Sequence, residues 1–399
     1  MIIGIIIALI LGVLAGTFTG ISPGIHINLV AAILVGSLSF FRFAPLIALA
    51  VFIVAMSITH TFTDFITSIF LGAPEEDSFL SILPGHQLLL EGRGHEAYIF
   101  TLYGSLIAVP IILLFTPIFL YTLPWLYPII TTAIPFILIF ISLYLIFREE
   151  KFLTSLVVFS LAGFLGFLTF NLPVRQPLMP LLSGLFGLSS LILSIKTKAI
   201  VPKQKIPPLK KIKLKTWKFL KALSAILISA PFCSFLPGIG SGHAATIGSE
   251  IIPQDRKGFL FLVGATNTII MGLSFIAVYS IGKARSGSAA VIEQILGRIT
   301  PADLTIILIT VVVSSILAAI IGINLSKLCA RHISRINYTK LTIITIAIIL
   351  LVNIIFSNWL GLLVLAISTS LGVFTILSNS RRINLMGALI IPAVIYYLI

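Results

Sequence analysis

Two Pro-Gly elements interrupt apolar stretches of the sequence, and both carry small and polar residues. The first contains Ser22, Pro23, Gly24, His26 and Asn28; the second contains Pro237, Gly238, Gly240, Ser241, Gly242 and His243. Proline ends an incoming helix and suits the first turn of the next one, and glycine lets a ligand approach the backbone. The half-helix that follows offers free N–H groups and the positive end of its dipole, which bind anions. The sequence therefore predicts an anion site at each element, with a proline-kinked, glycine-packed helix pair as the alternative.

A carboxylate, Asp64, lies next to Thr63 inside a long apolar stretch, and the corresponding stretch further along holds Asn267 between two threonines. Ionisable groups at membrane depth are costly and usually functional. Hydroxyl, amide and carboxylate oxygens are ligands for hard cations such as Na⁺, and a carboxylate also carries a proton. We therefore predict that Thr63, Asp64 and Asn267 couple transport to Na⁺ or H⁺, with no other cofactor. The alternative is a carboxylate near the interface, solvated or capping a helix.

The remaining polar residues indicate no metal and no catalysis. His26, His60 and His243 fit no zinc-ligand spacing and lack cysteine partners, so we expect hydrogen bonding, proton transfer or ordinary packing from them. Arg285, beside Lys283, lies in a basic loop whose first-half counterpart is acidic. It is a candidate for attracting an anionic substrate, unless the two loops are simply solvated. The sequence has neither a Walker nucleotide loop nor a nucleophile elbow, so we do not expect an enzyme.

The elements that position these residues are membrane helices. Of the 399 residues, 58% are hydrophobic and only 10% are charged. Soluble domains carry about 25% charged residues, so a soluble protein is excluded. The apolar runs are continuous, which favours helices over a barrel. We expect an all-α, multi-pass protein of the plasma membrane with about 12 segments, near residues 1–21, 45–71, 98–122, 127–147, 152–170, 178–195, 217–236, 258–281, 303–325, 341–357, 360–377 and 384–399.

The chain repeats itself at an offset of about 210 residues. Pro23-Gly24 matches Pro237-Gly238, the loop at Gly72 matches the loop at Gly282, and Gly85 matches Gly297. A short apolar stretch follows each Pro-Gly pair, at 25–41 and 239–252, and is too short to span a bilayer, which predicts a re-entrant hairpin. We therefore expect two inverted-topology repeats, residues 1–195 and 217–399, joined by a basic cytoplasmic linker at 196–216.

The net charge of +14 is concentrated in one loop. Ten lysines and no acidic residue lie between Lys196 and Lys221, and the rest of the chain carries 16 basic and 12 acidic residues. Such a loop marks the cytoplasmic face, and the proposed topology places the basic residues near 148–151, 256–257, 327–340 and 381–382 on the same side. Binding of lipid headgroups or nucleic acid is the alternative, and no nucleic-acid partner is expected.

These motifs resemble a known family. Pro23-Gly24 with His26 and Asn28, Gly72 to Ser78 followed by Leu83 to His86, and Pro237 to Gly242 resemble the large permease subunit of the tripartite tricarboxylate transporters, in a shorter archaeal form. The resemblance covers essentially the whole chain. It implies ion-coupled uptake of di- or tricarboxylates, with a small membrane subunit and an extracytoplasmic binding protein as partners.

We therefore expect a secondary active transporter that holds a small organic anion between two half-helix N-termini at mid-membrane. The second Pro-Gly element is also similar to hairpins of polyprenyl-phosphate transporters, so translocation of a lipid phosphate is the alternative. An intramembrane enzyme is a minor alternative, because Asp64 is the only aspartate inside an apolar segment. A structural scaffold would not need two polar hairpins.

Overall fold

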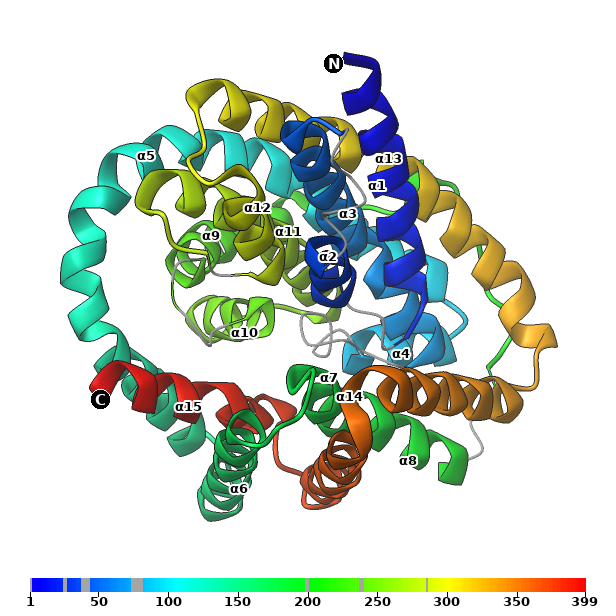
Figure 1. Ribbon diagram of the computed structural model, residues 1–399. Coiled ribbons are helices and arrows are strands. Elements are labelled where there is room, and N and C mark those ends of the chain that lie inside the picture. Colours follow the sequence, from blue (N-terminus) through cyan, green and yellow to red (C-terminus); the bar gives the residue numbers. More distant parts are fainter. Residues whose placement is uncertain are drawn as a thin grey trace.

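The structure, a computed structural model, describes residues 2–23, 27–36, 44–72, 82–197, 201–234, 236, 240–284 and 286–399. Every regular element in this part of the chain is a helix (Figure 1). In chain order the α-helices are α1 (Ile2–Ile21), α2 (Ile27–Gly36), α3 (Leu46–Ile66), α4 (Ile82–Leu90), α5 (Gly94–Phe147), α6 (Phe152–Asn171), α7 (Leu178–Leu182), α8 (Ser189–Thr197), α9 (Thr216–Cys233), α10 (Ser241–Ile251), α11 (Arg256–Ile281), α12 (Gly287–Leu296), α13 (Pro301–His332), α14 (Tyr338–Leu377) and α15 (Gly387–Leu398). Short π and 3₁₀ turns extend some of them.

Eight helical stretches among the described residues are long and apolar enough to cross a membrane. This confirms the predicted all-α membrane protein, but the number is smaller than the twelve segments expected. The main reason is that α5 and α14 each cover two of those segments. At about 1.5 Å per residue, the paths of α5 and α14 measured along the helices are about 80 and 60 Å long, against a bilayer core of about 30 Å. α14 is kinked at Asn358 (φ 61°), where the sequence predicts a break, whereas α5 continues through five prolines.

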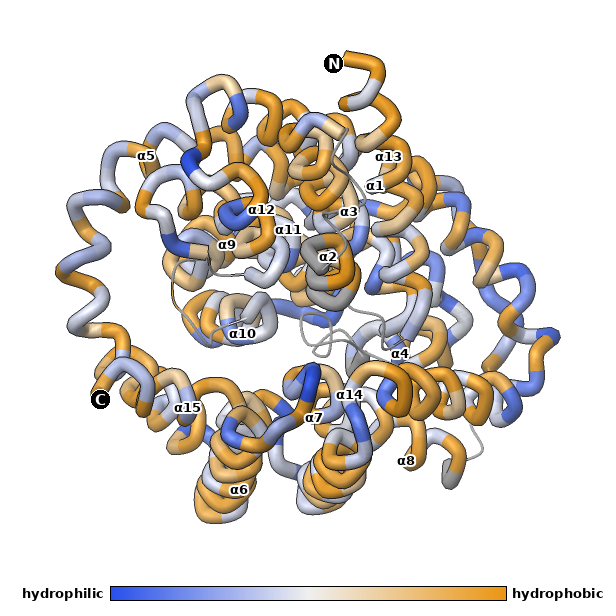
Figure 2. The backbone as a smooth tube through the Cα atoms, in the orientation of Figure 1, coloured by the Kyte–Doolittle hydropathy of each residue, from blue (hydrophilic) through white to orange (hydrophobic). Residues whose placement is uncertain are grey.

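The outer surface of the bundle is apolar. Large hydrophobic side chains on the outer faces of α1, α5 and α14 are strongly exposed, among them Ile3 (75%), Trp125 (79%) and Trp359 (73%). In Figure 2 the tubes of α1 and α14 are largely orange, and the arc of α5 alternates orange with paler segments. A soluble protein rarely exposes apolar patches of this extent, so these faces are suited to contact with lipid.

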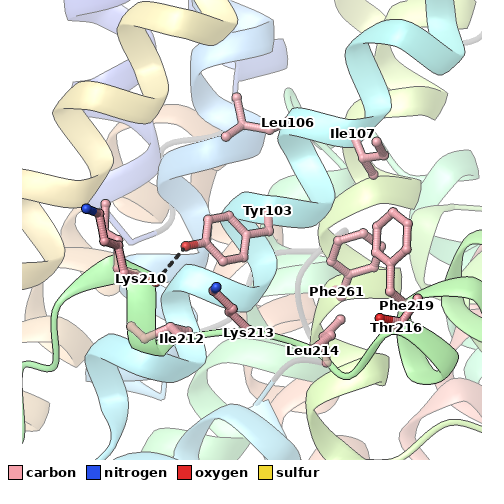
Figure 3. A pocket seen from close by; sticks show the side chains of 11 residues that line it. Tyr103, Leu106, Ile107, Lys210, Ile212, Lys213, Leu214, Thr216, Phe219 and Phe261 are labelled. Atoms are coloured by element: carbon pink, nitrogen blue, oxygen red, sulfur yellow. Dashed lines mark hydrogen bonds between the residues drawn. The ribbon is translucent and has the colours of Figure 1, made fainter.

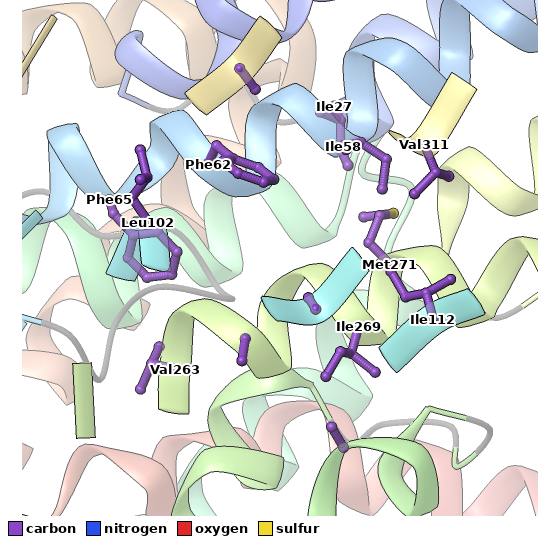
Figure 4. Packing of buried hydrophobic residues seen from close by; sticks show 14 of the residues in the cluster. Ile27, Ile58, Phe62, Phe65, Leu102, Ile112, Val263, Ile269, Met271 and Val311 are labelled. Carbon is purple, nitrogen blue, oxygen red and sulfur yellow. The ribbon is translucent and has the colours of Figure 1, made fainter. Parts of the chain in front are cut away.

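Helices α3 and α11 form the centre of the molecule. In the most apolar 18-residue stretch of each, 83% and 94% of the residues are buried. α5 packs against α11, and α13 packs against α3, so each half of the chain supplies a long helix to the other half. Buried residues of these helices form one apolar cluster, which includes Ile58, Met271 and Val311 (Figure 4). A second cluster joins the later part of α5 to α6, α14 and α15, in the lower part of Figure 1.

Helix α1 packs on α3 through glycines spaced four residues apart, Gly12, Gly16 and Gly20. A Cβ atom at Gly16 would overlap the carbonyl oxygen of Met56, and one at Gly20 would overlap the Thr63 hydroxyl. Small residues at this spacing let membrane helices approach closely. The close approach fixes the end of α1, and with it the first Pro-Gly element, against the polar half of α3.

The two halves have the same order of helix lengths. A long helix, a short one, a long one, a short one and a very long one follow each other as α1 to α5 and again as α9 to α13. Gly72 and Gly282, which the sequence comparison matches, both end a helix with a left-handed backbone (φ 66° and 58°), a conformation that favours glycine. The predicted match of Gly85 with Gly297 differs from the structure. Gly85 lies inside α4, and Gly92 ends α4 as Gly297 ends α12.

Ion pairs connect the basic loops that the sequence places on one side. Lys218 near the start of α9 pairs with Asp255 (2.5 Å), and Arg256 pairs with Glu91 (2.7 Å). Five residues before Asp255, Glu250 pairs with Arg148 (3.0 Å) and Arg381 (2.8 Å), and Arg381 also pairs with Glu149. The loops after α4 and α10 and the start of α9 therefore share one ion-paired group, and Glu250 links the loops after α5 and α14 in a second. Residues 250–255 join the two groups into one connected charged region.

Arg381 is central to this region, which allows a test of its contribution. Burial disfavours its charge, but hydrogen bonds to Glu149 and Glu250 outweigh that effect and raise the Arg381 pKa. Arg381→Ala would leave the two acids, with side chains only 8% and 15% exposed, without this partner. Because Arg381 is itself 40% exposed and Glu250 keeps Arg148 as a partner, we expect a loss of about 1–3 kcal/mol in the free energy of unfolding, between the values for exposed and buried ion pairs. Thermal unfolding in detergent measures the change. Arg335→Ala, at an exposed arginine, is the control, and equal melting temperatures for the two variants would contradict the prediction.

Candidate functional site

The two halves meet in a polar contact where α3 crosses α11. The Asn267 side-chain amide donates a hydrogen bond to Asp64 Oδ2 at 3.0 Å, and the hydroxyls of Thr61 and Thr268 are 3.0 Å apart. All four side chains are buried, with Asp64 only 1% exposed. A buried carboxylate needs compensating hydrogen bonds, and this one receives one from the opposite half of the chain. The sequence-predicted pair Asp64 and Asn267 is therefore in direct contact.

Helix α1 ends against the same turn of α3. The Thr63 hydroxyl donates to the carbonyls of Gly16 (3.2 Å) and Thr59 (3.0 Å), and the Thr67 hydroxyl donates to the carbonyl of Gly20 (2.6 Å). A Cβ atom at Gly20 would lie only 2.9 Å from the Asp64 nitrogen. Thr63 therefore joins α1 to α3 beside Asp64.

The first Pro-Gly element starts at this point. Ser22, half-buried, and Pro23, buried, directly follow the end of α1. Gly24, His26 and the side chain of Asn28 lie outside the described residues. Helix α2 begins at Ile27, which is fully buried and belongs to the same apolar cluster as Ile58 and Met271 (Figure 4). The start of this short helix is therefore inside the protein.

The second Pro-Gly element leads into α10. Gly240 precedes the helix, and its backbone N–H donates to His243 Nδ1 at 3.3 Å. Ser241, Gly242 and His243 form the first turn and are buried; Pro237 and Gly238 lie outside the described residues. The first N–H groups of a helix have no partner within that helix. A buried helix start of this kind directs a partial positive charge into the protein interior.

The start of α10 and the Asp64–Asn267 contact lie at similar helical distances from the loop that joins α10 to α11. Helix α10 has 11 residues, packs against α11, and is joined to it by only a short connection. At about 1.5 Å per residue, Ser241 lies about 16 Å from the charged region, and Asn267 lies about the same distance beyond Arg256 along α11. Ser241 and Asn267 therefore lie at similar distances along their helices from the connection at residues 252–255.

Several further polar contacts surround this site; hydrogen bonding by His60 was among the roles expected for it, whereas the contacts of Ser57 and Tyr98 were not predicted. His60 Nδ1 is 2.9 Å from the Thr19 hydroxyl, and the Ser57 hydroxyl donates to Ser288 on α12 (2.8 Å). On the side of α3 that faces α5, Tyr98 donates to the Phe62 carbonyl (3.1 Å). The signal available in the sequence was the run from Ser57 to Asp64, in which polar residues crowd an otherwise apolar helix.

Arg285 lies outside the described residues, and its neighbour Lys283 is exposed. Within the described ranges, no three His, Cys, Asp or Glu side chains gather into a group that could hold a metal ion. The site therefore consists of a carboxylate, amides, hydroxyls and helix N-termini. Such groups can bind a monovalent cation or proton and an anion close together.

Comparison with known proteins gives two matches. The family model described as "Tripartite tricarboxylate transporter TctA family" matches residues 6–387. An uncharacterized protein of Methanocaldococcus jannaschii is 33% identical, and the alignment covers 98% of each chain. No solved structure matches the chain.

Proposed function

Because this chain belongs to the tripartite tricarboxylate transporter TctA family, we propose that it is an ion-coupled carrier of a small organic anion, of the di- or tricarboxylate type, in the plasma membrane. The family and the eight membrane-length helices make it a multi-pass component of a membrane transporter. The single observation that supports the finer proposal is the buried Asp64–Asn267 contact, which joins the two halves. We place it, with the start of α10, near mid-membrane depth, because each lies about 16 Å along its helix from the α10–α11 connection and half of a bilayer core is about 15 Å.

The proposed architecture is a pair of inverted repeats, each with a re-entrant hairpin. The common order of helix lengths and the matching left-handed glycines Gly72 and Gly282 support the repeat. A contact between the two ends of the α9–α10 segment supports the proposed hairpin. Lys218 near the start of α9 pairs with Asp255 just beyond the end of α10, as expected if the chain returns to the side of the membrane from which it entered. Inversion then places the entry of α1–α2 on the opposite side.

The anion is proposed to bind between the two half-helix starts. Ser22, Pro23, Gly24, His26 and Asn28 would contact it from the first element, and Pro237, Gly238, Gly240, Ser241, Gly242 and His243 from the second. Two facing helix N-termini suit an acid with two or more carboxylates, because each dipole end stabilises one negative charge. Arg285 is a further candidate for attracting the anion from solution.

The coupling ion is proposed to bind at Thr63, Asp64 and Asn267. A negative Asp64 near the anion raises the energy of the bound anion, since like charges about 4 Å apart repel by about 4 kcal/mol at an effective dielectric constant of 20. A bound Na⁺ or proton removes that repulsion. The ion and the anion therefore raise each other's affinity, which couples the two fluxes.

Two further parts of the proposal follow from the family and the charges. The name of the family describes a tripartite transporter, so we propose a small membrane subunit and an extracytoplasmic binding protein as partners. The connected charged region, with the lysine-rich linker, is proposed to face the cytoplasm, because basic loops are retained there.

Anion binding at α10 can be tested by ligand-induced stabilisation of the purified protein. Citrate and succinate are expected to raise the melting temperature, since a ligand at 100 times its Kd stabilises by about 2.7 kcal/mol. Ser241→Asp would place a negative charge at the helix start and is expected to weaken binding by at least about 100-fold, from the repulsion of about 4 kcal/mol. Ser241→Asn, of the same size but neutral, is the matched control.

Equal binding by the two Ser241 variants would contradict an anion site at α10. Stabilisation of the wild-type protein by a polyprenyl phosphate and by none of the acids would instead support the lipid-carrier alternative.

A further inference from the structure

A groove of about 680 Å³ lies where the lysine-rich linker crosses the membrane helices. Its floor is apolar and includes Leu106 and Ile107 from α5, Phe219 from α9 and Phe261 from α11 (Figure 3). The linker closes one side with Lys210 and Lys213. The Tyr103 hydroxyl donates to the Leu209 carbonyl at 3.3 Å, which holds the linker against α5 next to Lys210 (Figure 3).

The charge of this groove is uncompensated. Both lysines are exposed, and the residues that line the groove include no acid. Within the described part of the chain neither Lys210 nor Lys213 forms an ion pair, whereas the nearby Lys218 and Lys257 pair with Asp255 and Glu96. The two free ammonium groups therefore offer a binding site for a negative group at the edge of an apolar channel.

The surroundings place the groove at the depth of lipid headgroups. Trp217, at the start of α9, is 67% exposed, and the Lys221 ammonium lies 5.6 Å from the centre of its ring. Exposed tryptophan and lysine side chains are typical of the membrane interface, where the ring or the aliphatic stem contacts acyl chains and the polar end contacts headgroups. A ligand here needs an anionic head and an apolar tail.

We propose that this groove binds an acidic phospholipid, with its phosphate on Lys210 and Lys213 and part of one apolar chain against Phe219 and Phe261. The apolar floor distinguishes the ligand from a soluble anion, because about 25 cal/mol is gained per Å² of apolar surface removed from water. The lysine-rich linker joins the two halves of the chain and forms one side of the groove. A lipid bound there would therefore hold the linker against α5 and α11. The inference needs only the membrane location of the chain and is independent of the proposed substrate.

Native mass spectrometry of the purified protein in detergent tests the site, with phosphatidylglycerol and phosphatidylcholine as probes of equal chain length. We expect the wild-type protein to bind phosphatidylglycerol at least about tenfold more tightly, because each lysine near an anionic headgroup contributes about 1 kcal/mol. The double variant Lys210→Gln/Lys213→Gln is expected to reduce this preference to less than about twofold. Lys203→Gln/Lys205→Gln, in the same linker but outside the groove, is the matched control and should keep it.

Equal binding of the two lipids to the wild-type protein would overturn the proposal. An equal loss in both double variants would also overturn it, since it would show a diffuse attraction to the basic linker. Glycerol phosphate, added in excess over phosphatidylglycerol, distinguishes a lipid site from a site for a free phosphate ester. If the soluble ester does not displace the lipid, the proposal is supported. If it displaces the lipid, the proposal is contradicted. Leu106→Trp, which fills the groove without changing charge, should weaken binding of both lipids.

Discussion

Asp64→Asn is expected to remove the dependence of anion binding on the coupling ion. In the wild-type protein, Na⁺ or a lower pH should strengthen binding of the transported acid by about 5–150-fold, the usual range of coupling between two sites. Asparagine keeps the size of the side chain and can still bond to Asn267, which reaches Asp64 at 3.0 Å. It carries no charge for an ion to neutralise. The variant should therefore bind the acid with an affinity that changes less than about twofold with either ion.

Titration of the acid by isothermal calorimetry, at high and low Na⁺ and at two pH values, measures this effect. Asp303→Asn is the matched control, because it makes the same chemical change at a carboxylate that caps the start of α13, far along the chain from the site. An ion dependence that survives in Asp64→Asn would assign the coupling to another group.

Gly16→Leu is expected to separate α1 from α3 and to destabilise the protein by about 3 kcal/mol. A side chain here would overlap the Met56 carbonyl and would disturb the bond from the Thr63 hydroxyl to the Gly16 carbonyl. Overpacking costs about 1–3 kcal/mol, and a lost hydrogen bond adds about 1 kcal/mol. Because α1 leads directly into Ser22 and Pro23, the acid should also bind more weakly.

Gly4→Leu is the control for this prediction, since it lies on the same helix and a Cβ atom there has no atom within 4 Å. Thermal unfolding in detergent should show a lower melting temperature for Gly16→Leu and little change for Gly4→Leu. Similar melting temperatures would mean that the glycine contact does not hold α1 in place.

Much of the fold could be predicted from hydropathy alone. Apolar stretches of membrane length identified the helices, because in lipid every backbone polar group must be satisfied within a helix or a closed barrel. The sequence predicted two separate segments where the structure has the single helix α5. Residues 122–127 include Pro124, a residue type that usually interrupts a helix, yet α5 continues through them. The opposite case is α14, where the predicted break coincides with the kink at Asn358.

The site was only partly predictable. Asp64 and Asn267 were identified because each is out of place in an apolar helix, and the structure brings them into contact. The neighbouring contact between the hydroxyls of Thr61 and Thr268 was missed, because threonine is common in membrane helices and its role depends on which face meets the neighbouring helix. The ion pairs around Arg381 were missed for a similar reason, although the sequence placed their basic residues on one side of the membrane. They join residues far apart in the sequence, and only the packing of α5, α10 and α14 brings them together.

The most direct test of the whole account is uptake of radiolabelled citrate and succinate by the purified protein in liposomes, with and without an imposed Na⁺ or proton gradient. We expect accumulation above the external concentration only when a gradient is present, and loss of that accumulation in Asp64→Asn. Since partner proteins are proposed, the assay is run both without and with a co-reconstituted small membrane subunit and extracytoplasmic binding protein of a tripartite tricarboxylate transporter. Accumulation that is independent of every ion gradient, or that Asp64→Asn leaves unchanged, would contradict an ion-coupled carrier centred on this carboxylate.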